Sequence, residues 1–280
     1  MTDVRRLGVK WCRCRWPNAA SYNPAVTQTA LLPSDVDAIE RATIATVSPE
    51  TTEELGDWLL AFDRGAIGRA KCAVPLSHSP FPIGDIATIE RRYAARGYPP
   101  MFRTPDLPQF EPFHAALRQR GYRDDRHSLV QVARAADVLA SEAAPDVTLA
   151  RRPDAVWGKV FLGEGFDPVE GASRVQSLSR AQDAIYASIL DEGKETARDA
   201  MAVGAASFGF GWASIHAMRT ALVHRRKGLA GRILSALANE AIDRGFERMF
   251  LQVEDNNAGA QSLYARAGFT TLWRYAYWQR

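Results

Sequence analysis

The feature that most constrains the fold is a short basic loop that joins a strand to an amphipathic helix. Residues 214–223 are predicted to form the strand. After the loop, apolar residues recur at the spacing of one helix face, at Leu229, Ala230, Ile233, Leu234, Leu237, Ala238, Ala241 and Ile242. This helix is expected to end near Gly245. The sequence therefore predicts an α/β fold arranged around this strand, loop and helix.

The loop has the composition of an anion-binding site. It begins with three consecutive cations at residues 225–227 and continues with Gly228, Ala230 and Gly231, which let a ligand approach the backbone. The unpaired N–H groups of the helix N-terminus and the positive end of its dipole converge there. Three full charges favour a pyrophosphate over a single carboxylate. A solvated basic turn with a glycine for tightness is the alternative interpretation.

Two motifs together resemble those of the GNAT acyltransferase superfamily. The loop reads Arg225-x-x-Gly228-x-Ala230, similar to the Q/R-x-x-G-x-G/A signature of that superfamily. The stretch from Asn257 to Phe269 resembles its other recurrent motif, N-x-x-A-x-x-L-Y-x-x-x-G-F. Their order and spacing are also those of the superfamily. The resemblance implies a mixed sheet and tandem GNAT-like domains that use acetyl-CoA as cosubstrate and bind no metal.

The resemblance also assigns residues to roles. The backbone of the strand before the loop holds the pantetheine arm, the loop holds the pyrophosphate, and Asn257 touches the cofactor or a neighbouring strand. The implied cofactor-binding residues are Met218, Thr220, Arg225, Arg226, Lys227, Gly228, Leu229, Ala230, Gly231 and Asn257. Tyr264 matches the proton donor to the departing thiolate, and a phenol is a suitable acid for this step. Packing in the core is the alternative role for Tyr264, and helix capping is the alternative for Asn257.

The sequence leaves the general base open. Several relatives carry a glutamate five residues before Asn257, but here that position is Gln252, which cannot take a proton. Glu254 lies two residues further along the same strand. His216 is the other candidate, on the strand before the loop, although a lone strand histidine is more often structural. A water chain without a single base is the third alternative.

The chain resembles itself at a nearly constant offset. The segments 96–98 and 244–246 match at an offset of 148 residues, and 120–122 and 267–269 match at 147. We interpret this as an internal duplication, with a degenerate GNAT-like domain at 1–140 and a catalytic domain at 147–280. The first copy has a proline-containing loop, residues 77–82, in the phosphate position and Leu117 in place of Tyr264. Proline removes N–H donors, so this copy is expected to bind no cofactor and to wall the substrate pocket.

The spacing of apolar residues, together with capping residues and glycines, predicts the other helices and strands. Helices are expected at residues 34–43, with Ser34 as N-cap, and at 51–62, 85–96, 157–166 and 173–190. Strands are expected at 70–74, at 147–149 and within 201–223, where Gly209 and Gly211 interrupt them. A linker is expected at residues 133–146.

Composition excludes several classes of protein. The chain has 280 residues, of which 46% are hydrophobic and 24% charged, as in ordinary globular proteins. A net charge of +3 does not favour nucleic acid as a partner. There is no apolar run long enough for a membrane helix and no signal peptide, so a cytoplasmic protein is expected. Cys12, Cys14 and Cys72 are expected to be reduced and structural.

The sequence thus predicts an N-acetyltransferase that transfers an acetyl group from acetyl-CoA to a primary amine by direct attack in a ternary complex. A small molecule or a peptide is the expected amine partner, with a homodimer as one allowed assembly. A non-catalytic acyl-CoA-binding or regulatory protein with the same fold is the rival interpretation, supported by Gln252. A P-loop nucleotide-binding protein is disfavoured because the Gly-Lys-Ser/Thr end of that motif is absent, since Leu229 follows Gly228.

Overall fold

The computed structural model describes residues 32–138, 146–163, 167–191 and 199–280. Its α-helices are α1 Pro33–Ala45, α2 Gly84–Ala95, α3 Glu111–Gln119, α4 Ala155–Lys159, α5 Pro168–Ser179, α6 Leu229–Asp243 and α7 Ala258–Arg266. Short 3-10 turns are η1 Gly68–Lys71, η2 Pro108–Phe110, η3 Ala135–Asp137 and η4 Leu222–His224. The strands are β1 Thr51–Leu55, β2 Trp58–Phe62, β3 Ala73–Pro75, β4 Phe102–Pro105, β5 Arg123–Arg134, β6 Val147–Ala150, β7 Ala184–Leu190, β8 Ala200–Gly209, β9 Trp212–Thr220, β10 Arg248–Glu254 and β11 Thr270–Gln279.

Within the described residues, eleven strands form one mixed sheet in the order β1-β2-β3-β4-β11-β5-β10-β9-β8-β7-β6. The pairs β3–β4 and β9–β10 are parallel, and the other neighbours are antiparallel. Each parallel pair is joined by a helix, α2 in the first half and α6 in the second. The mixed α/β fold predicted from the sequence is therefore the observed one.

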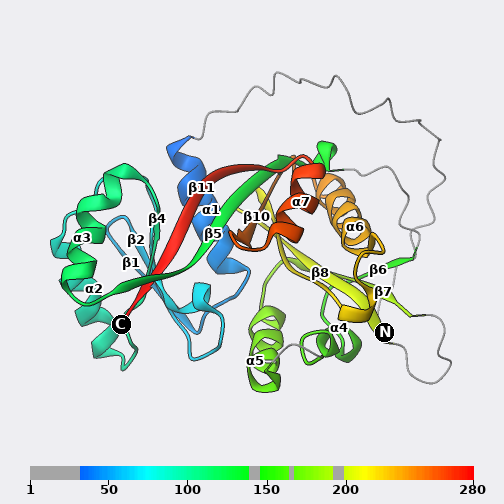
Figure 1. Ribbon diagram of the computed structural model, residues 1–280, viewed down its shortest axis with the longest axis horizontal. Helices are drawn as coiled ribbons and strands as arrows, with labels where there is room; N and C mark the ends of the chain where they lie inside the picture. The colour runs from blue at the N-terminus through cyan, green and yellow to red at the C-terminus, as the bar shows by residue number, and fades with distance from the viewer. Residues whose placement is uncertain (1–31, 139–145, 164–166, 192–198) are drawn as a thin grey trace.

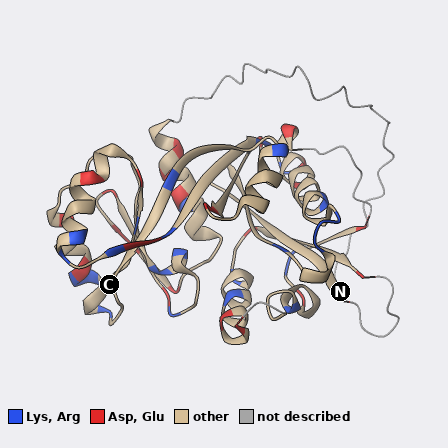
Figure 2. Cartoon of the chain, in the orientation of Figure 1, with Lys and Arg blue, Asp and Glu red and all other residues tan. Residues whose placement is uncertain are grey.

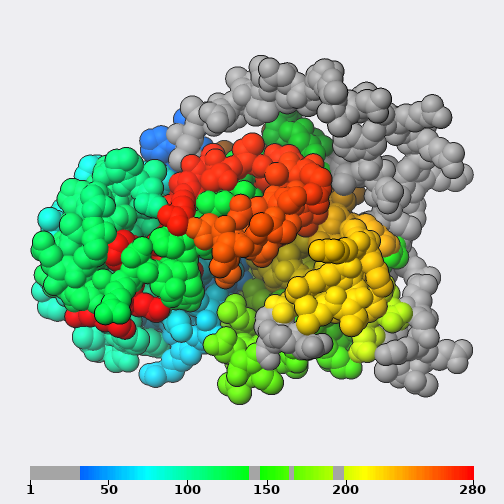
Figure 3. All heavy atoms as spheres, in the orientation of Figure 1, coloured from blue at the N-terminus to red at the C-terminus, as the bar shows by residue number. Residues whose placement is uncertain are grey.

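The two halves of the chain exchange their last strands at the centre of the sheet. β5 belongs to the first half in sequence but pairs with β10 of the second half. β11 belongs to the second half but pairs with β4 of the first. The two strands also pair with each other, from Thr270 opposite Val132 to Gln279 opposite Arg123. They run side by side through the middle of the molecule (Figure 1), and red atoms of β11 lie among the green ones of the first half (Figure 3).

The order of elements repeats along the chain. In both halves an antiparallel hairpin leads through a helix to a parallel strand, a second helix and a final strand. α3 begins at Glu111 and α7 at Ala258, and β5 begins at Arg123 and β11 at Thr270, so both pairs are offset by 147 residues. The domain boundary between 140 and 147 stays a prediction, since residues 139–145 are outside the described ranges. Cys12 and Cys14 are also outside them.

Helices cover both faces of the sheet. α6 and α7 pack on one face of the second half, over a cluster that includes Ile215, Ile233 and Leu251. α1 lies against the opposite face and contacts β3, β8 and β9, so it covers strands of both halves. None of the helices in the described ranges has the length and apolar content that crossing a bilayer requires.

Two predicted helices were wrong because a short apolar run fits more than one period. Residues 51–62 form the hairpin of β1 and β2, which turns at Gly56 with φ of 57°. β2 is buried at every residue, and a strand buried on both faces shows no alternation. Residues 173–190 contain the end of α5 and then β7, because the chain turns at Asp183 with φ of 46° before an apolar strand.

Smaller differences concern boundaries. α1 begins at Pro33 with Leu32 as N-cap, so Ser34 is inside the helix, where Pro33 supplies the preset φ of a first turn. The helix expected at 157–166 is shorter, since α4 ends at Lys159. The strand expected at 70–74 divides into η1 and β3. Residues 133–137, expected as linker, end β5 and form η3.

Candidate active site

The site is built where β9 and β10 separate. The two parallel strands pair only from Ala213 to Ile215 against Met249 to Leu251. Beyond this point β9 bulges: His216 lies opposite Ala205 and Arg219 opposite Val203, so two residues of β9 face one of β8. Ala217 within the bulge has φ of 57°, which is unfavourable for a residue with a Cβ. The bulge turns β9 away from β10 and opens a wedge between the two strands.

Gly204 of β8 allows the bulge to pack against α6. A Cβ at Gly204 would lie 2.5 Å from Sδ of Met218 and 2.6 Å from Cγ2 of Ile233. The carbonyl of Gly204 accepts a hydrogen bond of 3.2 Å from Nε1 of Trp157 on α4. This role of Gly204 was not predicted from the sequence, although an isolated glycine inside a strand is a signal of close backbone approach.

The basic loop leads from the wedge to the N-terminus of α6. Gly228 is the N-cap residue with φ of 74°, and Arg226 also has a positive φ, 63°. Arg225, Arg226 and Lys227 are exposed, and within the described residues none of them forms an ion pair with a carboxylate. Figure 2 shows these cations as a continuous blue segment. The loop therefore combines unpaired helical N–H groups with uncompensated charge.

Other predicted cofactor residues lie around the same loop. Leu229 is the first residue of α6, and its side chain is buried in the core, so only its backbone faces the loop. Thr220 lines a cavity of about 240 Å³ together with Lys159, Arg219 and Arg225. A larger hollow of about 780 Å³ lies at the other end of α6, and none of the predicted site residues line it. Asn257 caps α7 by accepting a hydrogen bond of 3.1 Å from the backbone N–H of Ala260, so its expected capping role is confirmed.

Tyr264 lies on α7 within the core beneath α6. Its ring packs edge-on against Phe269, with ring centroids 5.9 Å apart, and 6% of its surface is exposed. Burial raises the pKa of Tyr264 to about 12. The phenol is therefore protonated at neutral pH, which an acid requires.

His216 is buried on the opposite face of the sheet. Its Nε2 lies 2.9 Å from Oγ of Ser207, and Nδ1 has no partner in the described residues. Burial, with a smaller contribution from the charge of Arg69, lowers the pKa of His216 to about 3. The imidazole is thus neutral and able to accept a proton, but it is a weak base.

Gln252 is held on three sides. Its Nε2 donates to Oγ1 of Thr43 at 2.9 Å, and its Oε1 accepts from the hydroxyl of Tyr275 at 2.9 Å and from Nη1 of Arg69 at 3.3 Å. The amide thus links β10 to α1, η1 and β11. Arg69 comes from the first half of the chain, and no sequence motif pointed to it.

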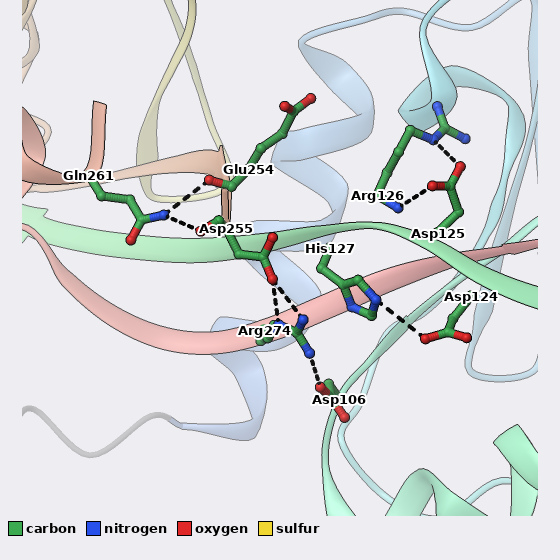
Figure 4. A network of polar contacts seen from close by, with 9 residues as sticks. All are labelled: Asp106, Asp124, Asp125, Arg126, His127, Glu254, Asp255, Gln261 and Arg274. Carbon is green, nitrogen blue, oxygen red and sulfur yellow. Dashed lines mark hydrogen bonds and ion pairs between the residues drawn. The ribbon is translucent and has the colours of Figure 1, made fainter. Parts of the chain in front are cut away.

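Glu254 lies two residues after Gln252 on β10, but its exposure and its side-chain contacts differ. It is exposed, and its carboxylate forms no ion pair within the described residues. Its backbone carbonyl accepts from Nε2 of Gln261 at 3.2 Å, whereas its side chain points away from the drawn contacts (Figure 4). In the same network Arg274 joins Asp255 after β10 to Asp106 after β4, which ties the second half to the first.

The corresponding region of the first half, around β3, β4 and the N-terminus of α2, is packed with its own side chains. β3 and β4 pair at one position, Ala73 opposite Phe102. Phe81 from the loop before α2 packs on Trp58, with ring centroids 4.8 Å apart. At the N-terminus of α2, Oδ2 of Asp85 accepts a hydrogen bond of 3.0 Å from Nε1 of Trp58. A carboxylate thus occupies the end of the helix that binds anions.

The fold that surrounds this site is similar to that of solved GCN5-related N-acetyltransferases. A structure of such an enzyme from Kribbella flavida superposes with a TM-score of 0.63 at 16% identity, covering 87% of this chain and 95% of that one. A tandem GNAT protein from the clavulanic acid biosynthesis pathway gives 0.55 at 14% identity, covering 88% and 87%. These likenesses concern the fold.

Sequence comparison gives the family. A family model described as "Probable histone acetyltransferase Rv0428c C-terminal" matches residues 33–278. The chain belongs to this family, within the GNAT N-acetyltransferase superfamily. It is also 25% identical over 249 residues to the uncharacterized N-acetyltransferase YobR of Bacillus subtilis, covering 87% of this chain and 98% of that protein.

Proposed function

We propose that the protein transfers an acetyl group from acetyl-CoA to a primary amine by direct attack in a ternary complex. The observation that carries this proposal is the wedge between β9 and β10, which begins at the bulge of Ala217 and leads to the basic loop. Pyrophosphate on the loop and the pantetheine arm along Met218 and Thr220 place a thioester in the wedge. A small molecule or a peptide supplies the amine.

The reaction needs a proton donor for the departing thiolate and a proton acceptor for the amine, and candidates for both are present. The buried phenol of Tyr264, which is protonated at neutral pH, donates its proton to the departing thiolate. Proton removal from the amine falls to His216, to the exposed Glu254, or to water. The amine nitrogen forms a bond to the carbonyl carbon, and the C–S bond breaks as the thiolate takes the proton.

The test is a screen of amines with acetyl-CoA, with release of free CoA thiol as readout. The acceptors include small amines, amino acids and a lysine peptide, because the family description names histone as a substrate of a relative. Acetyl transfer with a product confirmed by mass spectrometry supports the proposal.

A non-catalytic acyl-CoA-binding protein is the second candidate. It is favoured by Gln252, whose amide is hydrogen-bonded to three residues at a position where several relatives carry a glutamate. Tight binding of acetyl-CoA by calorimetry, with no transfer to any amine in the screen, would select this candidate instead.

A further inference from the structure

Arg69 lies over the point where β9 and β10 separate. It belongs to η1 of the first half, and its Nη1 donates to Oε1 of Gln252 at 3.3 Å. Its charge also acts on His216 and helps to lower the pKa of that imidazole. Gln252 and His216 directly follow Leu251 and Ile215, the last paired residues of the two strands. One guanidinium from the first half thus reaches the point where the two strands separate.

The charge of Arg69 has no carboxylate partner among the described residues. Other arginines that join elements in this region are compensated: Arg103 pairs with Glu40 and Arg180 with Asp63. Arg69 is half-buried, and within the described residues the one hydrogen bond of its guanidinium goes to a neutral amide oxygen. A partly desolvated guanidinium without a counter-ion is unfavourable, and its remaining N–H groups suit a carboxylate.

Arg69 and Tyr264 lie on opposite faces of β9 and β10. Tyr264 and α6 cover one face of β9 and β10. His216, Gln252 and Arg69 lie on the other face, together with α1. An amine that attacks a thioester held in the wedge therefore approaches from the face that carries Arg69.

We propose that Arg69 is a specificity-determining residue that binds a carboxylate of the acceptor, so that the preferred substrates are amines that also carry an acid group. This inference rests on the proposed function and adds the substrate class. It also gives the first half a role in the site, since Arg69 reaches the wedge from η1.

The test compares amino acids of increasing chain length with their carboxamides as acceptors, for the wild-type protein and Arg69→Gln. The wild type is expected to favour the acid over the carboxamide in kcat/KM by about 10- to 100-fold, the size of a hydrogen bond to a charged group. Arg69→Gln is expected to abolish this preference, and Arg69→Lys to keep part of it. Arg64→Gln is the control, because Arg64 is exposed on the same segment and contacts the ring of Tyr98.

A binding measurement separates this inference from the proposed function. Ligand-observed NMR with CoA present measures binding of an N-acetyl amino acid and of its carboxamide, without turnover. Weaker binding of the acid to Arg69→Gln, with thermal stability and CoA affinity retained, supports the carboxylate site even if no amine is acetylated. Equal use and equal binding of acid and carboxamide by the wild type, or a better reaction with a basic lysine peptide, overturns it.

Discussion

At the scale of single residues, the hydroxyl of Tyr264 is open to the sharpest test. Tyr264→Phe removes one oxygen from a buried ring and keeps its packing against Phe269. If the phenol protonates the departing thiolate, kcat is expected to fall by about 10²- to 10⁴-fold, while CoA affinity is nearly unchanged. Steady-state kinetics and calorimetry measure the two quantities.

Tyr122→Phe is the matched control for this substitution. Tyr122 is also buried, burial also raises its pKa to about 12, and it lies in the first half, where its hydroxyl bonds to Glu90. Its replacement is expected to leave kcat unchanged. Full activity of Tyr264→Phe would show that the phenol is not the proton donor.

The low pKa of His216 predicts that the free energy of unfolding depends on pH. The pKa of its imidazole is about 3 in the folded chain and near 6.5 when unfolded. As pH falls below 6.5 the unfolded chain binds the proton first, so folding loses stability down to about pH 3. The advantage of the wild type over His216→Asn in the free energy of unfolding is therefore expected to shrink by about 1 kcal/mol per pH unit between pH 6 and 4.

Denaturant titrations at several pH values measure this difference, in which the other titrating groups cancel. A constant difference would mean that the imidazole is already charged in the folded state. The same low pKa moves any acid limb in the activity profile that is due to His216 far below pH 6.

At the scale of elements, the junction between the basic loop and α6 is expected to carry the CoA affinity. Ala230→Glu places a negative charge in the first turn of α6, where the pyrophosphate is proposed to bind. Because the site relies on cations and unpaired N–H groups, the affinity for CoA by calorimetry is expected to fall at least about 100-fold. Asn239→Glu is the control, since it adds the same charge to α6 two turns away.

Elements were predictable where a local signal was strong. The loop, α6 and α7 follow from helical spacing, glycine and the Asn257 cap, and all of these signals lie within the elements themselves. The hairpin at 51–62 was missed because Leu55, Trp58 and Phe62 fit a helical period as well as a buried strand. Arg69 was not predictable, because its neighbours Gln252 and His216 are distant in sequence and only the tertiary fold brings them together.

At the scale of the whole molecule, the difference between the two halves predicts one CoA site per chain. The second half has an open basic loop, whereas Phe81 and Asp85 occupy the corresponding region of the first half. Calorimetry is expected to give one CoA bound per chain, and Ala230→Glu is expected to remove it without uncovering another. A second site that persists in this variant would contradict the prediction.

The exchange of β5 and β11 has a consequence for how the chain matures during translation. β4 and β5 leave the ribosome long before β11, yet β11 is the strand that fills the space between them. Until it arrives, both strands present an open edge, and such edges invite association with other chains. Before β10 emerges, β5 has no partner strand, and once β10 has paired with it the sheet still consists of two pieces, one of β1–β4 and one that ends at β5. β11 then joins the two pieces, because it pairs with β4 on one side and with β5 on the other.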